Sequence, residues 1–359
     1  MQLFFDTPIE DEKFHPKYKL LNNNLMLHGE REILKKWADG FIDRDGKILY
    51  ELQTTFHSTF WEFYIHQLLK NMGETIDFTK HRPDFIVKKD DGSDKFYIEA
   101  VVSEIKKTGR PEDDRNSADL EMTETPLWKL PDFENIINEG VIRCSNAFSG
   151  KLKKYANYIK EPWVKTDVPY IIGMSSFSQL NYGLESHYSI LALLYGFYIK
   201  EDGLSFEKRN FVVKQETGAE LPLNIFDDET NSDVSAVLFS SKVTLGKLTA
   251  LAISNGHPNL NSVISVYGDT ELPYFKIKPV TPDNPELFSD GLFLFHNPKA
   301  KNPLNPSIFK DQGIIQVFKK NGYLEFDGDQ LPLICRVNRF TPGPMKEMYI
   351  SKLAIDFNS

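Results

Sequence analysis

The chain has 359 residues and a formal net charge of −9 at pH 7; 41% of its residues are hydrophobic and 26% are charged. This is the composition of a folded globular protein with one large domain or two of ordinary size. It argues against a surface that coats nucleic acid broadly, because phosphate binding relies on clustered lysines and arginines. A local basic cleft remains compatible with it.

Membrane and secretory features are missing from the sequence. No run approaches the roughly 18 uninterrupted apolar residues that a membrane helix needs. The first stretch, MQLFFDTPIEDEKF, lacks the basic-then-apolar layout of a secretory signal. The two cysteines, Cys144 and Cys335, give neither a disulfide framework nor metal-binding spacing. We therefore expect a protein of the reducing cytoplasm with no membrane partner.

The first half of the chain predicts a helix followed by three strands. Residues 1–45 are mixed and charged, with a helix expected near 28–38, and we treat them as an N-terminal extension. FHSTFWEFYIHQLLKNMG, residues 56–73, is apolar on most sides and ends on glycine, which predicts a buried helix. ETIDF, PDFIVKK and KFYIEAVV then predict strands, the last two joined as a hairpin through DDGSD.

The next segment predicts an excursion, a helix and a strand. Residues 104–140 are polar, charged and proline-containing, which is typical of a mobile loop. A helix is expected from about 145 to 160, with an apolar stripe of Phe148, Leu152, Tyr155 and Ile159. PYIIGMSSF, residues 169–177, predicts a buried strand. The resulting order is α-β-β-β-α-β, a mixed α/β core within residues 46–200.

The last part of the chain gives weaker signals. SHYSILALLYGFYI predicts a helix, and VSAVLFSS and GLFLFHNP predict strands. Residues 201–359 form an accessory region of unknown role. The sequence leaves open whether this region is a second α+β domain or an elaboration of the first sheet.

Three acids stand out by position. Glu62 lies on the 56–73 helix, Asp84 follows Pro83 at the start of the second strand, and Glu99 lies inside the third. The hairpin could bring Asp84 near Glu99. Two carboxylates about 4 Å apart repel by roughly 4 kcal/mol at an effective dielectric of 20. Such a cluster persists if it is protonated, paired with a cation or bound to a hard metal ion such as Mg²⁺.

Pro83-Asp84, Glu99 within Ile-Glu-Ala, and Glu62 on the preceding helix resemble the PD-(D/E)XK nuclease superfamily, as does the element order. The resemblance runs from the 56–73 helix to the strand at 169–177. It implies a restriction-endonuclease-like fold and a metal-dependent endonuclease that cleaves nucleic acid, DNA above all. Asp84 and Glu99 would bind Mg²⁺ or Mn²⁺, and Glu62 would be an auxiliary ligand or water contact. A role in bacterial restriction or phage defence and a homodimeric state are further implications.

The sequence departs from the superfamily at its lysine, because that position holds Val101. A lysine can come from a neighbouring helix instead. On the 145–160 helix, Lys151 lies about 60° from the centre of the apolar stripe, against about 140° for Lys153 and about 120° for Lys154. Lys151 is therefore the expected replacement. Lys153, Lys154 and Arg143, eight residues before Lys151, are expected nucleic-acid contacts, unless they form an ordinary solvated helix face.

Competing interpretations exist for each residue. Glu104-Ile105-Lys106 is a literal E-x-K, but it lies where the strand gives way to the charged segment. Glu99 could form a structural ion pair with Arg143 or Lys151, Glu62 could pair with His66, and Asp84 could cap a turn. His57 and His66 are nine residues apart and do not form the pair of a zinc helix.

Two functional alternatives stay open. Val101 favours a non-catalytic protein that uses the nuclease fold to bind nucleic acid or a protein partner. The acidic balance keeps a structural or regulatory protein without nucleic-acid contact in view.

Overall fold

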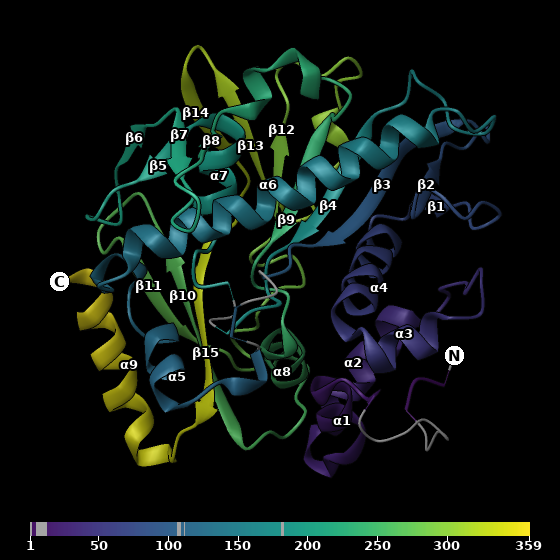
Figure 1. Ribbon diagram of the computed structural model, residues 1–359. Coiled ribbons are helices and arrows are strands. Elements are labelled where there is room, and N and C mark those ends of the chain that lie inside the picture. The colour runs from purple at the N-terminus through teal and green to yellow at the C-terminus, as the bar shows by residue number, and fades with distance from the viewer. Residues whose placement is uncertain (1, 5–12, 106–108, 111, 181–182) are drawn as a thin grey trace.

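The structure is a computed structural model that describes residues 2–4, 13–105, 109–110, 112–180 and 183–359. A mixed eight-stranded sheet forms its centre (Figure 1). From one edge to the other, the strands are β1 (Thr75–Ile76), β2 (Phe85–Lys88), β3 (Asp94–Val102), β4 (Tyr170–Ser175), β9 (Ala236–Ser240), β12 (Phe293–His296), β13 (Ile315–Lys320) and β14 (Tyr323–Asp327). β1, β2 and β3 are antiparallel neighbours, whereas β3, β4 and β9 run parallel. β9 and β12 are antiparallel, β12 and β13 parallel, and β13 and β14 antiparallel.

Helices pack on both faces of this sheet. One face carries α1 (Pro16–Asn23), α2 (His28–Ala38), α3 (Ile48–Thr54), α4 (Phe56–Asn71) and α8 (Leu245–Ser254). The other face carries α6 (Phe133–Tyr158) and α7 (Tyr188–Tyr195), and α6 crosses the strands diagonally (Figure 1). The sheet is therefore the middle layer of three.

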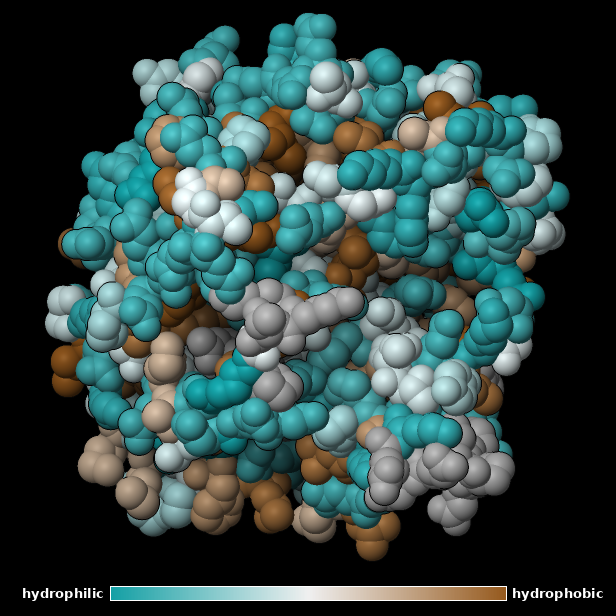
Figure 2. Space-filling model, in the orientation of Figure 1, coloured by the Kyte–Doolittle hydropathy of each residue, from teal (hydrophilic) through white to brown (hydrophobic). Residues whose placement is uncertain are grey.

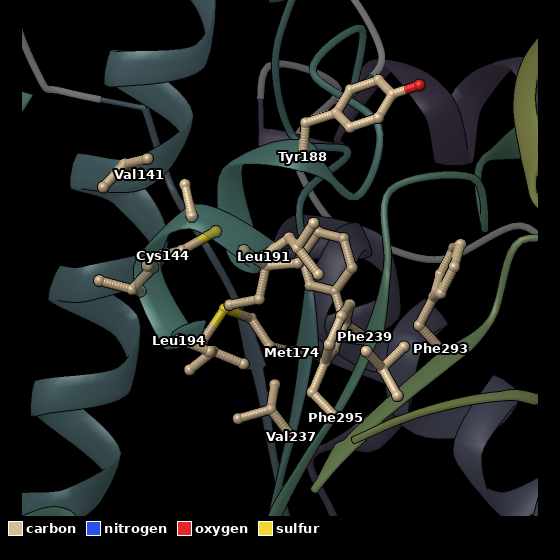
Figure 3. Close-up of a cluster of buried hydrophobic side chains, with 14 of the residues drawn as sticks. Val141, Cys144, Met174, Tyr188, Leu191, Leu194, Val237, Phe239, Phe293 and Phe295 are labelled. Atoms are coloured by element: carbon tan, nitrogen blue, oxygen red, sulfur yellow. The ribbon is translucent and has the colours of Figure 1, made fainter. Parts of the chain in front are cut away.

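The alternation of side chains along β3 divides the hydrophobic core in two. Phe96, Ile98 and Ala100 belong to the cluster on the α4 side, and Tyr97 belongs to the cluster on the α6 side. Successive strand residues point to opposite faces, so Glu99 shares the α6 side with Tyr97. Figure 3 shows part of this second cluster, in which residues of α6 and α7 face those of β4, β9 and β12: Val141, Cys144, Leu191, Leu194, Met174, Val237, Phe239, Phe293 and Phe295.

The expected α-β-β-β-α-β order is present as α4, β1, β2, β3, α6 and β4. The helix expected near residues 28–38 is α2, and the expected hairpin is β2–β3. The predicted loop over 104–140 is wrong in part, because α5 (Ser117–Thr123) lies within it and α6 begins at Phe133. Phe133, Ile137 and Val141 recur every fourth residue and are buried, a helical stripe that the surrounding polar residues concealed.

The C-terminal region completes the central sheet rather than forming only a separate one. β9, β12, β13 and β14 continue it beyond β4. A second sheet has the order β11 (Phe275–Pro279), β10 (Asn261–Gly268) and β15 (Leu333–Phe340), and α9 (Gly343–Asn358) packs on β11. Two short ribbons pair β5 (Phe197–Ile199) with β6 (Phe206–Lys208) and β7 (Phe211–Val213) with β8 (Glu220–Pro222). Among the helices described, none is long and apolar enough to cross a membrane.

Candidate active site on β2, β3 and α6

Asp84 and Glu99 face each other across the β2–β3 hairpin. Phe85 pairs with Ile98, so one further step of the antiparallel register sets Asp84 opposite Glu99. The backbone N–H of Ala100 donates a hydrogen bond of 2.8 Å to Oδ2 of Asp84. The proximity expected from the sequence is therefore present: Glu99 lies in β3, and Asp84 lies in the bend that leads directly into β2.

Two contacts hold the segment that leads into Asp84. The Arg44 guanidinium donates to the carbonyl oxygen of Lys80 at 2.6 Å, and the Trp163 indole N–H donates to that of Arg82 at 3.0 Å. These two residues come from parts of the chain before and after the hairpin. The backbone before Asp84 is thus anchored at two points.

Glu99 is a buried carboxylate with partners on one oxygen only. Its side chain is 2% exposed. Lys151 Nζ donates to Oε1 at 2.8 Å, and the Tyr158 hydroxyl donates to the same oxygen at 3.0 Å. Oε2 is buried and has no hydrogen-bond partner. A buried acceptor without a partner costs roughly 1–3 kcal/mol, so this oxygen is a position where a ligand would add stability.

The ionisation of the site reflects its crowded charges. Burial raises the pKa of Asp84 to about 6, and the negative charge of Glu99 raises it in the same direction, whereas Lys151 opposes the shift. Burial lowers the pKa of Lys151, but the charges of Glu99 and Asp84 outweigh this effect and leave it above its ordinary value. Lys151 therefore stays cationic, and it compensates only part of the repulsion between the two acids.

Glu62 is electrostatically linked to the same site. It projects from α4 and is partly buried. Burial raises the pKa of Glu62 well above its ordinary value, and the charges of Asp84 and Glu51 raise it further. Within the described part of the chain, however, the three acids do not form a set whose donor atoms all lie within 4.8 Å of one another.

The basic residues of α6 are arranged differently from the helical projection in one respect. Lys151 reaches inward, as expected. The helical projection directs Lys154 about 120° away from the apolar stripe, yet its Nζ lies 4.0 Å from Oε1 of Glu99 although the side chain is 57% exposed. A long flexible lysine side chain can reach away from its Cβ direction, which a helical projection does not capture. Lys153 is exposed, and Arg143 is buried in an ion pair of 2.7 Å with Glu185.

Other sequence candidates lie apart from this site. A ring nitrogen of His66 contacts the backbone oxygen of Trp37 at 2.8 Å, so its contact is with backbone and not with Glu62. Glu104 is exposed just beyond β3, and Lys106, its partner in the literal E-x-K, lies outside the described residues.

A cluster that the sequence did not reveal surrounds Glu112. His57 Nε2 lies 2.7 Å and His15 Nε2 3.4 Å from Oε1 of Glu112, and Lys17 Nζ donates to Oε2 at 2.6 Å. His15, His57 and Glu112 are the one described trio whose donor atoms lie within 4.8 Å. The Lys17 ammonium already balances the carboxylate charge, so an ion-pair cluster accounts for this arrangement. Its members come from three distant segments, and no spacing rule in the sequence could have joined them.

Comparisons with protein-family models, with curated proteins and with solved structures found no match.

Proposed function

We propose that the protein is a divalent-metal-dependent nuclease that hydrolyses phosphodiester bonds of nucleic acid, with Asp84, Glu99 and Lys151 at its centre. The observation that carries this proposal is the buried Glu99 carboxylate, which has Lys151 on one oxygen and no partner on the other. Most buried polar atoms in native proteins have a hydrogen-bond partner, so the free oxygen favours a partner that the chain does not itself supply. A cation beside Glu99 and Asp84 would contact the free oxygen of Glu99 and reduce the repulsion between the two acids.

The donor set suits a hard cation. Carboxylate oxygens are the ligands that Mg²⁺ and Mn²⁺ prefer, and Asp84 and Glu99 would supply them, with Glu62 as a contact through a bound water. The raised pKa of Asp84, caused first by burial and then by Glu99, means that a cation at this position would relieve existing repulsion. When bound, such a cation polarises a phosphate and lowers the pKa of a water molecule.

The chain's own groups have complementary roles. Lys151 brings a positive charge to a buried site, where it can stabilise negative charge that develops on a phosphate. Tyr158 and Lys151 fix the orientation of Glu99, and the Ala100 N–H fixes that of Asp84. Lys151 comes from α6 instead of β3, which would compensate for Val101 in the position where the resemblance expects lysine.

One observation favours a second function, a non-catalytic protein of the same fold. Val101 is partly buried on β3 and cannot contact water or phosphate as a lysine does. In that case the Glu99–Lys151 pair would serve stability alone. Nucleic-acid binding would then be independent of Mg²⁺ and would survive loss of the acids.

A cleavage assay separates the two functions. We expect Mg²⁺- or Mn²⁺-dependent cleavage of plasmid or single-stranded DNA, reduced at least a hundredfold in Asp84→Asn and Glu99→Gln. Asp90→Asn is the matched control, because Asp90 is an exposed acid in the turn of the same hairpin, and Glu104→Gln tests the rival E-x-K. Full activity in the first two variants, both folded by circular dichroism, would refute the proposal. Loss in Glu104→Gln alone would move the site to the rival motif.

A further inference from the structure

A cleft of about 770 Å³ adjoins the candidate site. Its walls are one face of α6, the end of β3 with the residues just after it, and the turn between β7 and β8. The α6 wall runs from Asn135 to Lys154, roughly 28 Å at 1.5 Å per residue. Figure 2 shows the face over which α6 runs, with hydrophilic side chains over most of it and hydrophobic ones in recesses between them. The cleft is elongated, and its volume falls in the range of small-molecule sites, about 300–1,000 Å³.

The lining combines apolar walls with amide groups. Val101 of β3 and Ile142 and Ala147 of α6 supply aliphatic surface, and Asn135, Asn146 and Gln215 supply donors and acceptors. An unpaired nucleobase has two apolar faces and a polar edge, and proteins hold it between apolar side chains and hydrogen-bonding groups. The chemistry of the lining matches that of a nucleobase.

Two lining residues have buried polar atoms without partners. Arg143 is 8% exposed, and its Nε has no hydrogen-bond partner although its terminal nitrogen is held by Glu185 at 2.7 Å. Oδ1 of Asn135 is likewise buried and without a partner. Each unsatisfied buried group costs roughly 1–3 kcal/mol. One unsatisfied donor and one unsatisfied acceptor therefore lie in side chains of the same wall, and a polar ligand would reach them if these side chains turned toward the cleft.

The positively charged lining residues gather at the end of the cleft that meets the candidate site. Lys151 and Lys154 line the cleft and also lie 2.8 and 4.0 Å from Oε1 of Glu99. The remaining charged lining residues are Arg143, Lys214, Glu104, Glu139 and Glu216. Positive charge is therefore concentrated where the cleft meets the site, which is where a phosphate would lie, and the rest of the cleft is nearly balanced in charge.

We propose that this cleft binds an unpaired nucleotide of the substrate strand, so that the substrate class is single-stranded nucleic acid or a strand end with unpaired bases. A continuous duplex keeps its bases stacked and paired inside, and it cannot place one in the cleft without extruding it. The proposal specifies the substrate of the proposed nuclease, and it rests on that function for the cleavage reaction. The binding itself is measurable separately.

Gly150 offers a direct way to block the cleft. It lies on α6 in the lining, and a Cβ added there meets no atom within 4 Å. Gly150→Phe should therefore place a ring in the cleft without backbone strain. Replacing a glycine inside a helix also removes a propensity cost, so the helix is retained. Ser149→Phe is the matched control, because Ser149 is an exposed neighbour outside the lining.

The probes are a fluorescent twelve-nucleotide single-stranded DNA, the same sequence as RNA, and the corresponding blunt DNA duplex. Their anisotropy is measured with Ca²⁺ in place of Mg²⁺, with gels to verify that they stay intact. We expect at least one single strand to bind at least tenfold more tightly than the duplex, and Gly150→Phe to weaken this binding at least tenfold. Ser149→Phe should bind like the unmodified protein, and Asn135→Leu should bind several-fold more weakly.

Three results would overturn the inference: binding of the duplex as tight as that of both single strands, unchanged single-strand binding in Gly150→Phe, or absence of binding to every probe. Failure of the proposed nuclease function can be distinguished from failure of the proposed nucleotide binding. Cleft-dependent binding without metal-dependent cleavage rejects the chemistry alone, whereas cleavage that persists in Gly150→Phe rejects the cleft alone.

Discussion

At the scale of single residues, the candidate site depends on the pairing of Glu99. Removing one partner of a buried ion pair leaves an uncompensated charge and costs roughly 3–5 kcal/mol. Lys151 is 11% exposed and Glu99 2% exposed in their side chains, so this pair is of the buried kind. Its strength makes the site rigid, and the free Oε2 makes it receptive to a cation.

Lys151→Met should therefore reduce both stability and activity. We expect the free energy of unfolding at neutral pH to fall by roughly 3–5 kcal/mol in urea titrations. Lys153→Met, two residues along the same helix and exposed, should change it by less than about 0.5 kcal/mol.

The double variant Glu99→Gln/Lys151→Met separates stability from catalysis. Removing both charges should restore most of the stability, because no buried charge is left without a partner. It should not restore cleavage. Recovery of cleavage together with stability would mean that the pair acts only on the fold.

Much of the site could be predicted from the sequence at this scale, and the features that could not be predicted have physical causes. Strand pairing follows from local alternation and a turn, so Asp84 and Glu99 could be expected to meet. The reach of Lys154 could not, because a flexible side chain is free to bend away from its Cβ direction. The half-buried state of Glu62 and its link to Asp84 depend on how α4 packs against the sheet, which its own residues do not specify.

At the scale of elements, the segment between β3 and α6 differs most from expectation. Its composition is that of a loop, yet it contains α5 and the first turns of α6. Local polarity concealed a helix that is stabilised by burial of one narrow stripe, as in other amphipathic helices. This segment also carries Glu112, which joins it to α4 through His57 and to the start of α1 through His15 and Lys17.

The Glu112 cluster predicts a stability that falls in acid. Burial raises the pKa of Glu112, but the hydrogen bond from His57 and the charge of Lys17 outweigh this and hold it at about 2, below the ordinary value of 4.5. The unfolded chain then binds more protons between these values, so the stabilisation is complete above pH 4.5 and is lost as the pH falls toward 2. Burial, and then the charge of His57, lower the pKa of His15 from 6.5 to about 4, which adds a loss between those pH values.

Glu112→Gln tests this prediction. At pH 7 it should lower the free energy of unfolding by roughly 1.5–3 kcal/mol, the contribution of hydrogen bonds to a charged group. The difference from the unmodified protein should shrink as the pH falls below 4.5. Asp114→Asn, an exposed neighbour, is the control. A difference that is constant from pH 7 to 3 would contradict the assigned cause.

At the scale of the whole molecule, one sheet unites the two halves of the chain. β4 pairs with β3 on one side and with β9 on the other, and its residues are buried on both faces. The C-terminal strands are thus structurally continuous with the hairpin that carries the site. Sequence patterns could identify β9 and β12 as buried strands but not their order, because strand pairing between distant segments leaves no local signal.

We propose that the carboxylates around Glu99 bind a divalent cation, and titration calorimetry with Mn²⁺ measures this binding without any substrate. We predict binding to the unmodified protein, loss of that binding in Glu99→Gln, and retention in Asp90→Asn, whose substituted residue is exposed in the turn of the hairpin. Absence of binding to the unmodified protein, or equal binding in Glu99→Gln, would contradict it. Glu99 would then be a structural acid held by Lys151, and the protein would belong with the non-catalytic alternative.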